Sequence, residues 1–202
     1  MRIDRLNIER KSCAVAGFLV FLLAIDASAA ELRAIDFSRD GDRYTLRSVT
    51  WFDADVAAVY SVLIDYDQSH RFSGAITESR NLAPDDEGRP EYFTRMEDCI
   101  LIWCQSFDRV GYLELEPIHR IEAFTDPERS DFKMMRERWQ LEEVEEGTLL
   151  TYKFEMVPDF WVPPLLGPYL IKRALITGGR KAANRLEVIA IEEAVTQTVS
   201  EP

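Results

Sequence analysis

Apolar and polar residues alternate along much of the chain, and this pattern predicts a series of β-strands. The clearest case is the segment 148–156, where Leu150, Tyr152, Phe154 and Met156 alternate with polar side chains. Such alternation is typical of an antiparallel strand with one buried face. Six more segments combine strand-forming residues with turn residues between them, and we expect strands at 44–52, 75–82, 92–98, 105–116, 120–124 and 133–141.

Helical spacing appears after the first strand and again near the C-terminus. The first helix would place on one face Val56, Val59, Tyr60, Leu63 and Ile64. A second short helical or irregular piece is expected at 66–72. A long helix from about 169 to 194 would carry an apolar stripe made of Ile171, Leu175, Ala182, Leu186 and Ile189. Gly178 and Gly179 interrupt this stripe; because glycine inside a helix costs up to about 1 kcal/mol per residue, the pair predicts either close packing or a bend.

The expected elements follow one another as strand, two short helices, six strands and a long helix. An amphipathic helix and a one-faced sheet each need a partner that buries their apolar side. We therefore predict an α+β fold in which one curved antiparallel sheet wraps around the long C-terminal helix, with two short helices after the first strand. Such a sheet can leave a cavity between itself and the helix.

This order resembles the helix-grip fold of the START-like (SRPBCC) superfamily, which includes the polyketide cyclase and coenzyme Q-binding groups. The resemblance rests on 56–67 as the first helix and its corner, on 138–141 with 148–152 as the last hairpin, and on the prolines at 158 and 163–164. It covers nearly all of the chain beyond the N-terminal segment. The resemblance implies a cavity for an apolar ligand such as a lipid, isoprenoid or polyketide, but it does not imply one chemistry.

The N-terminal segment 1–29 has the pattern of a cleaved secretory signal peptide. A basic start is followed by 13 residues without charge at 13–25 and by the small residues Ala27, Ser28 and Ala29, as such signals require. An uncleaved membrane anchor is the alternative, but a spanning helix needs roughly 20 apolar residues. We expect the protein to be exported, to the periplasm or as a secreted protein. Export departs from the coenzyme Q-binding group, whose members act inside mitochondria or the cytoplasm.

The composition indicates one acidic globular domain. The chain is 47% apolar and 11% aromatic, which is typical of a folded protein. We expect a START-like domain at 30–195, which is long enough to bury a core, and a short polar tail at 196–202. The formal net charge is -12, and about -13 without 1–29. General electrostatic attraction to nucleic acid is therefore excluded.

Two cysteines remain after 1–29, Cys99 and Cys104. Five steps along a straight strand cover about 16 Å, whereas a disulfide needs Cα atoms about 4.4–6.8 Å apart. A disulfide therefore requires the chain to turn within 100–103. Exported proteins can keep disulfides, and we favour the bond over two free cysteines in one strand.

Our main hypothesis for function is an exported binder or carrier of a hydrophobic small molecule or lipid. Aromatic side chains with a few polar groups are typical of such cavities. The candidate lining residues are Tyr92, Trp139, Tyr152, Phe154, Trp161 and Tyr169. A change of one residue in strand parity would turn each strand residue to the other face, and a packed core without ligand is the alternative for all six.

We identify no catalytic residue, metal site or cofactor in the sequence. His70 lies near two aspartates and His119 lies in a turn, but both patterns are more typical of solvent-facing histidines than of acid–base catalysts. Glu137, Arg136 and Arg138 could place a charge in the cavity, although a solvated strand face is the simpler interpretation. The alternative functions are an enzyme of the cyclase or hydrolase type on a hydrophobic substrate, and an interaction module with a filled core.

A proline-rich segment at 157–168 and the helix after it suggest a peripheral membrane site. Between 169 and 185 there are five basic residues and no acidic one, a local reversal in an acidic chain. Apolar side chains beside basic ones can meet anionic lipid. The membrane-facing candidates are Phe160, Trp161, Leu165, Leu166, Lys172 and Arg173. The alternative is that the aromatic residues close the core of the sheet.

Overall fold

The computed structural model describes residues 30–100 and 103–200, so the predicted signal peptide lies outside the described residues. The strands are β1 (Glu31–Asp40), β2 (Arg43–Phe52), β3 (Ile76–Leu82), β4 (Glu91–Ile100), β5 (Trp103–Glu116), β6 (Arg120–Thr125), β7 (Phe132–Val144) and β8 (Gly147–Pro158). The helices are α1 (Val56–Ile64), α2 (Ser69–Phe72) and α3 (Gly167–Ser200), with short 3-10 turns η1 (Tyr66–Gln68) and η2 (Pro127–Arg129).

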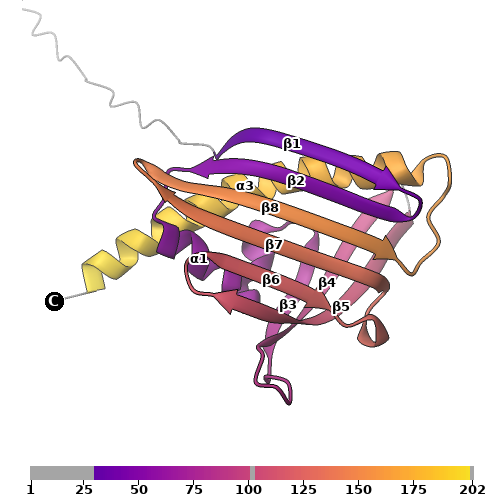
Figure 1. Cartoon of the computed structure of the whole chain (residues 1–202), viewed down its shortest axis with the longest axis horizontal. Helices are drawn as coiled ribbons and strands as arrows, with labels where there is room; N and C mark the ends of the chain where they lie inside the picture. Colours follow the sequence, from indigo (N-terminus) through magenta and orange to yellow (C-terminus); the bar gives the residue numbers. More distant parts are fainter. Residues whose placement is uncertain (1–29, 101–102, 201–202) are drawn as a thin grey trace, which may run out of the picture.

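The strands form one antiparallel sheet in the order β1-β2-β8-β7-β6-β5-β4-β3. Because β2 pairs with β8, the beginning and the end of the domain lie side by side, and β1 and β3 form the edges. The sheet is long and curved, and α3 crosses behind it and extends past it near α1 (Figure 1). This arrangement confirms the predicted α+β fold, including the two short helical pieces between β2 and β3.

Strand β1 is an element that the sequence pattern did not predict. It forms an edge of the sheet, and none of its residues is fully buried. Ile35 and Phe37 pack against a core cluster from this strand. Because an edge strand has one neighbour and needs few apolar residues, its sequence resembles a polar linker. The other seven strands overlap the predicted ranges.

The buried apolar residues divide into two clusters along the length of the sheet. The first core cluster lies next to α1 and the C-terminal half of α3, and it includes Phe52, Tyr60, Tyr92, Leu113, Ile121, Leu141, Leu150, Leu186 and Ile189. The second core cluster lies next to the N-terminal half of α3, and its buried members are Tyr44, Leu46, Phe132, Met135, Phe154 and Met156. A long sheet thus carries two apolar centres rather than one.

Helix α3 spans both clusters, with Leu175 packed against the second and Leu186 buried in the first. The expectation of close packing at the glycine pair is wrong, because a Cβ added to Gly178 or Gly179 would meet no atom within 4 Å. The helix continues through the pair and reaches six residues beyond the predicted end at 194. Among the described residues, neither α3 nor any other helix is long and apolar enough to cross a membrane.

The chain reverses direction between β4 and β5, as the predicted disulfide requires. The register places Cys99 directly opposite Cys104. Opposite residues of an antiparallel pair have Cα atoms about 4.5–5.5 Å apart, which falls within the disulfide range of about 4.4–6.8 Å. The turn residues 101–102 lie outside the described part of the chain, and the disulfide itself stays a prediction.

Candidate ligand-binding site

Five polar side chains form a row across the inner face of the sheet, the face toward α3. We call this row the polar belt; its members, one from each of the neighbouring strands β4 to β8, are Thr94, Arg109, Thr125, Glu137 and Tyr152. The belt separates the two core clusters. In β7, for example, Leu141 belongs to the first cluster and Met135 to the second, and the belt residue of that strand lies between them.

A buried ion pair is the centre of the belt. Arg109 binds Glu137, and their side chains are only 4% and 12% exposed. The Tyr152 hydroxyl donates a hydrogen bond to Glu137 Oε1 over 2.5 Å, and Arg109 Nε donates to Thr125 Oγ1 over 2.9 Å. The guanidinium also lies over the ring of Tyr92, with Cζ 4.9 Å from the centroid. The two charges are thus held in fixed positions inside an aromatic environment.

The surroundings of the belt keep the Arg109 guanidinium charged and the phenols neutral. Burial alone would lower the pKa of the Arg109 guanidinium, but Glu137 and nearby tyrosines outweigh it, and the pKa is raised. Burial, together with the charge of Glu137, raises the pKa of Tyr152 well above its usual value. Burial also raises the pKa of Tyr92 to about 12. The belt therefore combines a buried guanidinium and its carboxyl partner with neutral phenolic hydroxyl groups.

Two buried atoms of the belt have no hydrogen-bond partner in the described part of the chain: Arg109 Nη2 and Thr94 Oγ1. The two residues are directly opposite each other in the β4–β5 register, so their side chains are neighbours on the inner face. A buried polar group without a partner costs about 1–3 kcal/mol, and native proteins rarely leave one. Since a guanidinium N–H donates and a hydroxyl donates or accepts, one oxygen acceptor between them would satisfy both.

The inner side of α3 is unpacked at the level of the belt. Gly178 and Gly179 follow Leu175 by three and four residues, a spacing that places them on the side of the helix that packs on the sheet. Nevertheless both glycines are exposed, with open space where a Cβ would stand. They lie between the α3 residues of the two clusters, just as the belt lies between the two clusters in the sheet.

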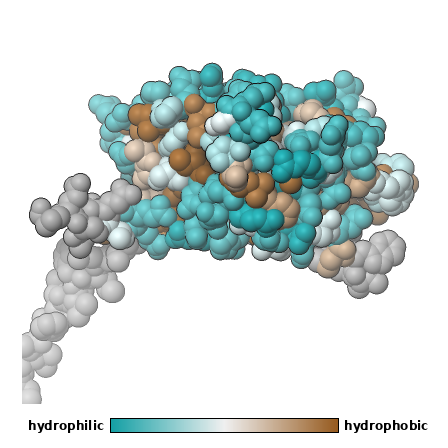
Figure 2. All heavy atoms as spheres, turned by 90° about the horizontal axis from the view of Figure 1, so that it is seen from below, coloured by the Kyte–Doolittle hydropathy of each residue, from teal (hydrophilic) through white to brown (hydrophobic). Residues whose placement is uncertain are grey.

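Two hollows open elsewhere on the surface. One, of about 380 Å³, lies at the corner between β2 and α1 and is lined by several carboxylates of that corner and of the β7–β8 turn. The other, of about 410 Å³, lies between α2 and α3. Neither of these two hollows is lined by a belt residue. On the face shown in Figure 2, apolar side chains reach the surface in several separate patches among hydrophilic ones.

The structure divides the predicted lining residues into an inner and an outer group. The inner group is at least partly buried on the sheet and consists of Tyr92, Trp139, Tyr152 and Phe154. The rings of Trp139 and Tyr152 are neighbours, with centroids 5.4 Å apart. By contrast, Trp161 and Tyr169 are 75% and 62% exposed, so they lie outside the interior that the other four share.

Sequence reasoning found only part of the charged site: it named Glu137 among three residues that could place a charge in the cavity, but it favoured a solvated strand face. The sequence leaves Arg136, Glu137 and Arg138 together on one strand, but the structure places Glu137 inside, while Arg136 and Arg138 bind Glu122 on the opposite face. The alternation of side chains along the strand could have predicted that Glu137 faces the cavity, because Glu137 precedes by two residues the tryptophan Trp139, which was predicted to line it. Arg109 was not singled out, although it lies on the same strand face as the apolar residues Phe107 and Leu113, which pack inward.

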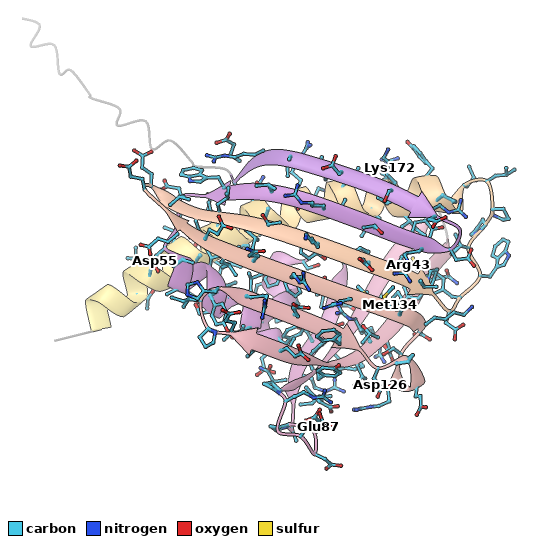
Figure 3. The ribbon with its side chains drawn as sticks, viewed as in Figure 1. Arg43, Asp55, Glu87, Asp126, Met134 and Lys172 are labelled. Carbon is cyan, nitrogen blue, oxygen red and sulfur yellow. The ribbon has the colours of Figure 1, made fainter. Side chains whose placement is uncertain are left out.

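The predicted membrane-facing residues also fall into a buried and an exposed group. Phe160 is partly buried in the second core cluster, with its ring centroid 4.2 Å from that of Phe107 and 5.8 Å from that of Phe132. The other candidates are exposed side chains: Trp161, Leu165, Leu166, Lys172 and Arg173. Figure 3 shows Lys172 near the start of α3, beside the end of β1.

The two histidines lie away from the belt. His70 is in α2 and His119 is in the turn between β5 and β6, and both are exposed. Within the described ranges, no group of three or more histidine, cysteine, aspartate or glutamate residues is placed to hold a metal ion.

Solved structures with the same architecture identify the fold. No protein-family model matches the sequence, and no curated protein matches it. The chain is similar to the Zhui aromatase/cyclase from Streptomyces sp. R1128, with a TM-score of 0.60, 12% identity, and 75% of this chain and 96% of that chain covered. It is also similar to human STARD10, with a TM-score of 0.59, 10% identity, and coverage of 83% and 76%.

A third similar structure is the STAR-related lipid transfer protein from Xanthomonas axonopodis, with a TM-score of 0.56, 13% identity, and coverage of 75% and 98%. At these identities the likeness shows the fold alone. The neighbours are START-superfamily proteins, which confirms, at the level of the fold, the resemblance inferred from the sequence.

Proposed function

We propose that the protein binds a hydrophobic small molecule or lipid between the sheet and α3, with one polar group of the ligand at the polar belt. The observation that carries this proposal is the pair of unpartnered buried atoms, Arg109 Nη2 and Thr94 Oγ1, together with the open space beside the glycine pair of α3. Two structural neighbours, a lipid transfer protein and an aromatase/cyclase, support a ligand of this class.

The charge of the belt favours a ligand whose polar group is an uncharged oxygen, such as a hydroxyl or carbonyl. Glu137 already neutralises Arg109, so a ligand carboxylate would add an unbalanced negative charge to the interior. Burying an uncompensated charge is costly, whereas a neutral acceptor only has to accept the free N–H. The two apolar clusters on either side of the belt would hold the hydrocarbon part of the ligand.

We further propose that the protein is exported with residues 1–29 removed, that Cys99 and Cys104 form a disulfide, and that the protein carries its ligand to or from a membrane surface. The cysteine register supports the disulfide. Native mass spectrometry of protein purified from the exported fraction tests the processing, the disulfide and the ligand. It should show the mature N-terminus, the loss of two hydrogens from the cysteines, and a bound apolar molecule after organic extraction.

Ligand selectivity tests the polar belt directly. Purified protein is titrated with a long-chain alcohol, the ketone, the carboxylic acid and the alkane of the same length. The alcohol and the ketone should bind most tightly. Protein that binds none of the four would overturn the proposed function, whereas tightest binding of the acid would overturn the assignment of an uncharged oxygen.

The variant Thr94→Val separates binding from packing. It removes an unpartnered hydroxyl at nearly constant volume, so the free energy of unfolding should stay constant or rise. Alcohol binding should weaken two- to tenfold, because a neutral hydrogen bond contributes about 0.5–1.5 kcal/mol. Ser79→Ala is the matched control, since Ser79 Oγ is also buried without a partner but lies in β3, outside the belt. Equal affinity of both variants would exclude the belt as the polar subsite.

A further inference from the structure

The segment that leads into α3 exposes a group of large apolar side chains. Trp161, Leu165, Leu166 and Tyr169 are 75%, 93%, 65% and 62% exposed, and we call them the apolar tip. Every other exposed large hydrophobic side chain in the described ranges is less exposed, the next being Val195 at 59%. Scattered apolar residues on a surface are normal, but a contiguous group marks a site of interaction.

The apolar tip stands on a fixed base. Phe160, directly before it, packs against the rings of Phe107 and Phe132 in the second core cluster. Behind Leu165 and Leu166, the Gly167 N–H donates to the Pro163 carbonyl over 2.8 Å. The backbone of the tip is thus tied to the core before it meets a partner, so little ordering is needed on binding.

A row of unpaired cations continues from the tip along α3. Among the described residues, no ion pair involves Lys172, Arg173, Arg180, Lys181 or Arg185. All five are exposed, and the first acidic residue of α3 is Glu187. We call these five residues the basic stripe. In a chain with 36 acidic and 24 basic side chains, five exposed cations of α3 without an ion pair in the described structure leave a positive surface available to an anionic partner.

We propose that the apolar tip and the basic stripe together bind an anionic lipid bilayer. Apolar side chains at the headgroup boundary, with cations beside them facing acidic lipids, are the two contributions that peripheral membrane binding combines. The positive charge of the basic stripe indicates that the partner surface is anionic. The strong exposure of the apolar tip indicates that this surface also accepts apolar side chains, as a bilayer does. The loop between β8 and α3 projects from one end of the molecule, away from the sheet (Figure 1), where it is free to approach a flat surface.

Docking in this way would also bring the route through which a ligand could enter close to the bilayer. This point alone rests on the proposed function. Gly178 and Gly179 lie between Arg173 and Arg180 in sequence, in the same turns of α3 as the basic stripe but on the side of the helix that faces the sheet. The unpacked part of α3 would therefore be held close to the bilayer from which a hydrophobic ligand comes.

Sedimentation with lipid vesicles tests the proposal on the mature protein. Vesicles of phosphatidylcholine are compared with vesicles in which phosphatidylglycerol replaces about a third of the lipid. Binding should require the anionic lipid and should fall steeply at high salt, because surface charges are screened. The tip variant Leu165→Ser with Leu166→Ser should lose at least tenfold in affinity. The matched control is Val188→Ser with Val195→Ser, which removes exposed apolar residues from the other half of α3.

Charge reversal tests the stripe separately. Each basic residue near an anionic membrane contributes about fivefold to binding, so Arg173→Glu with Arg180→Glu should lose at least about 25-fold. The control is Arg47→Glu with Lys153→Glu on the outer face of the sheet, where both cations are also without an ion pair in the described structure. Absence of binding to anionic vesicles, or equal losses in test and control variants, would overturn the proposal.

A soluble anion could also bind the basic stripe, and inorganic phosphate distinguishes it from a bilayer. If millimolar phosphate abolishes vesicle binding while the tip variant still binds normally, the stripe recognises a soluble anion, and the bilayer proposal is wrong. Alcohol binding without vesicles is measured in parallel. The tip variant should keep it, so a failure of membrane docking and a failure of the ligand site give different results.

Discussion

Removing the anionic half of the buried ion pair should destabilise the protein strongly. Glu137→Leu would leave the Arg109 guanidinium, 4% exposed, as an uncompensated charge between two apolar clusters. Breaking a buried ion pair by removing one partner costs about 3–5 kcal/mol. For a domain of this size that loss corresponds to a fall in melting temperature of about 6–20 °C. Because total stabilities are about 5–15 kcal/mol, the variant should still fold at low temperature.

Urea unfolding followed by tryptophan fluorescence measures the effect, with the urea m-value as the check that the same surface unfolds. The double variant Arg109→Leu with Glu137→Leu is the decisive control. Well-packed apolar replacements of a buried ion pair are often neutral or stabilising by about 1–4 kcal/mol, so the double variant should be at least as stable as the original protein. A loss below about 1 kcal/mol for Glu137→Leu would refute the claim that the pair is desolvated.

Three other changes have expected outcomes. Burial, with the charge of Asp53, raises the pKa of Glu187 in the folded protein. Ionisation of this carboxyl therefore costs stability as the pH rises above the value of about 4.3 that is usual for an unfolded chain. Glu187→Gln should make the urea midpoint less dependent on pH above that value. Gly111→Ala should lower the melting temperature sharply in a thermal scan, because its Cβ would overlap a carbonyl oxygen of the neighbouring strand. If Cys99 and Cys104 are bonded, reduction should cost about 2 kcal/mol in urea unfolding, and Cys99→Ser should be insensitive to reductant.

The fold was predictable because its signals are local. Period-two alternation in the central strands and three- or four-residue spacing in α1 and α3 require only that one face of each element is buried. Edge strand β1 was not predicted, because it buries no residue completely and so lacks the alternating apolar pattern. The glycine pair in α3 was interpreted as a place of close packing or a bend, because the sequence shows that glycine weakens a helix but not which atoms lie next to it.

The site was less predictable because its charged members come from strands far apart in sequence. Arg109 and Glu137 are 28 residues apart and meet only because β5 and β7 flank β6 in the sheet. The aromatic lining was easier, since Tyr92 and Phe154 fit any buried face. A charged residue on an apolar strand face is by itself weak evidence of a binding site, because the sequence does not show which distant residue pairs with its charge.

The polar belt is costly as a packing device, and this cost is an argument for binding. A chain folded for stability alone would place apolar residues at 109 and 137, as the double variant does, and valine at 94. Instead the belt keeps two charges in the interior and leaves a guanidinium N–H and a hydroxyl without partners among the described residues. If the belt serves binding, the double variant combined with Thr94→Val should fold stably and should bind alcohol and alkane equally. A preference for the alcohol that persists in this triple variant would show that the belt serves the fold and that selectivity arises elsewhere.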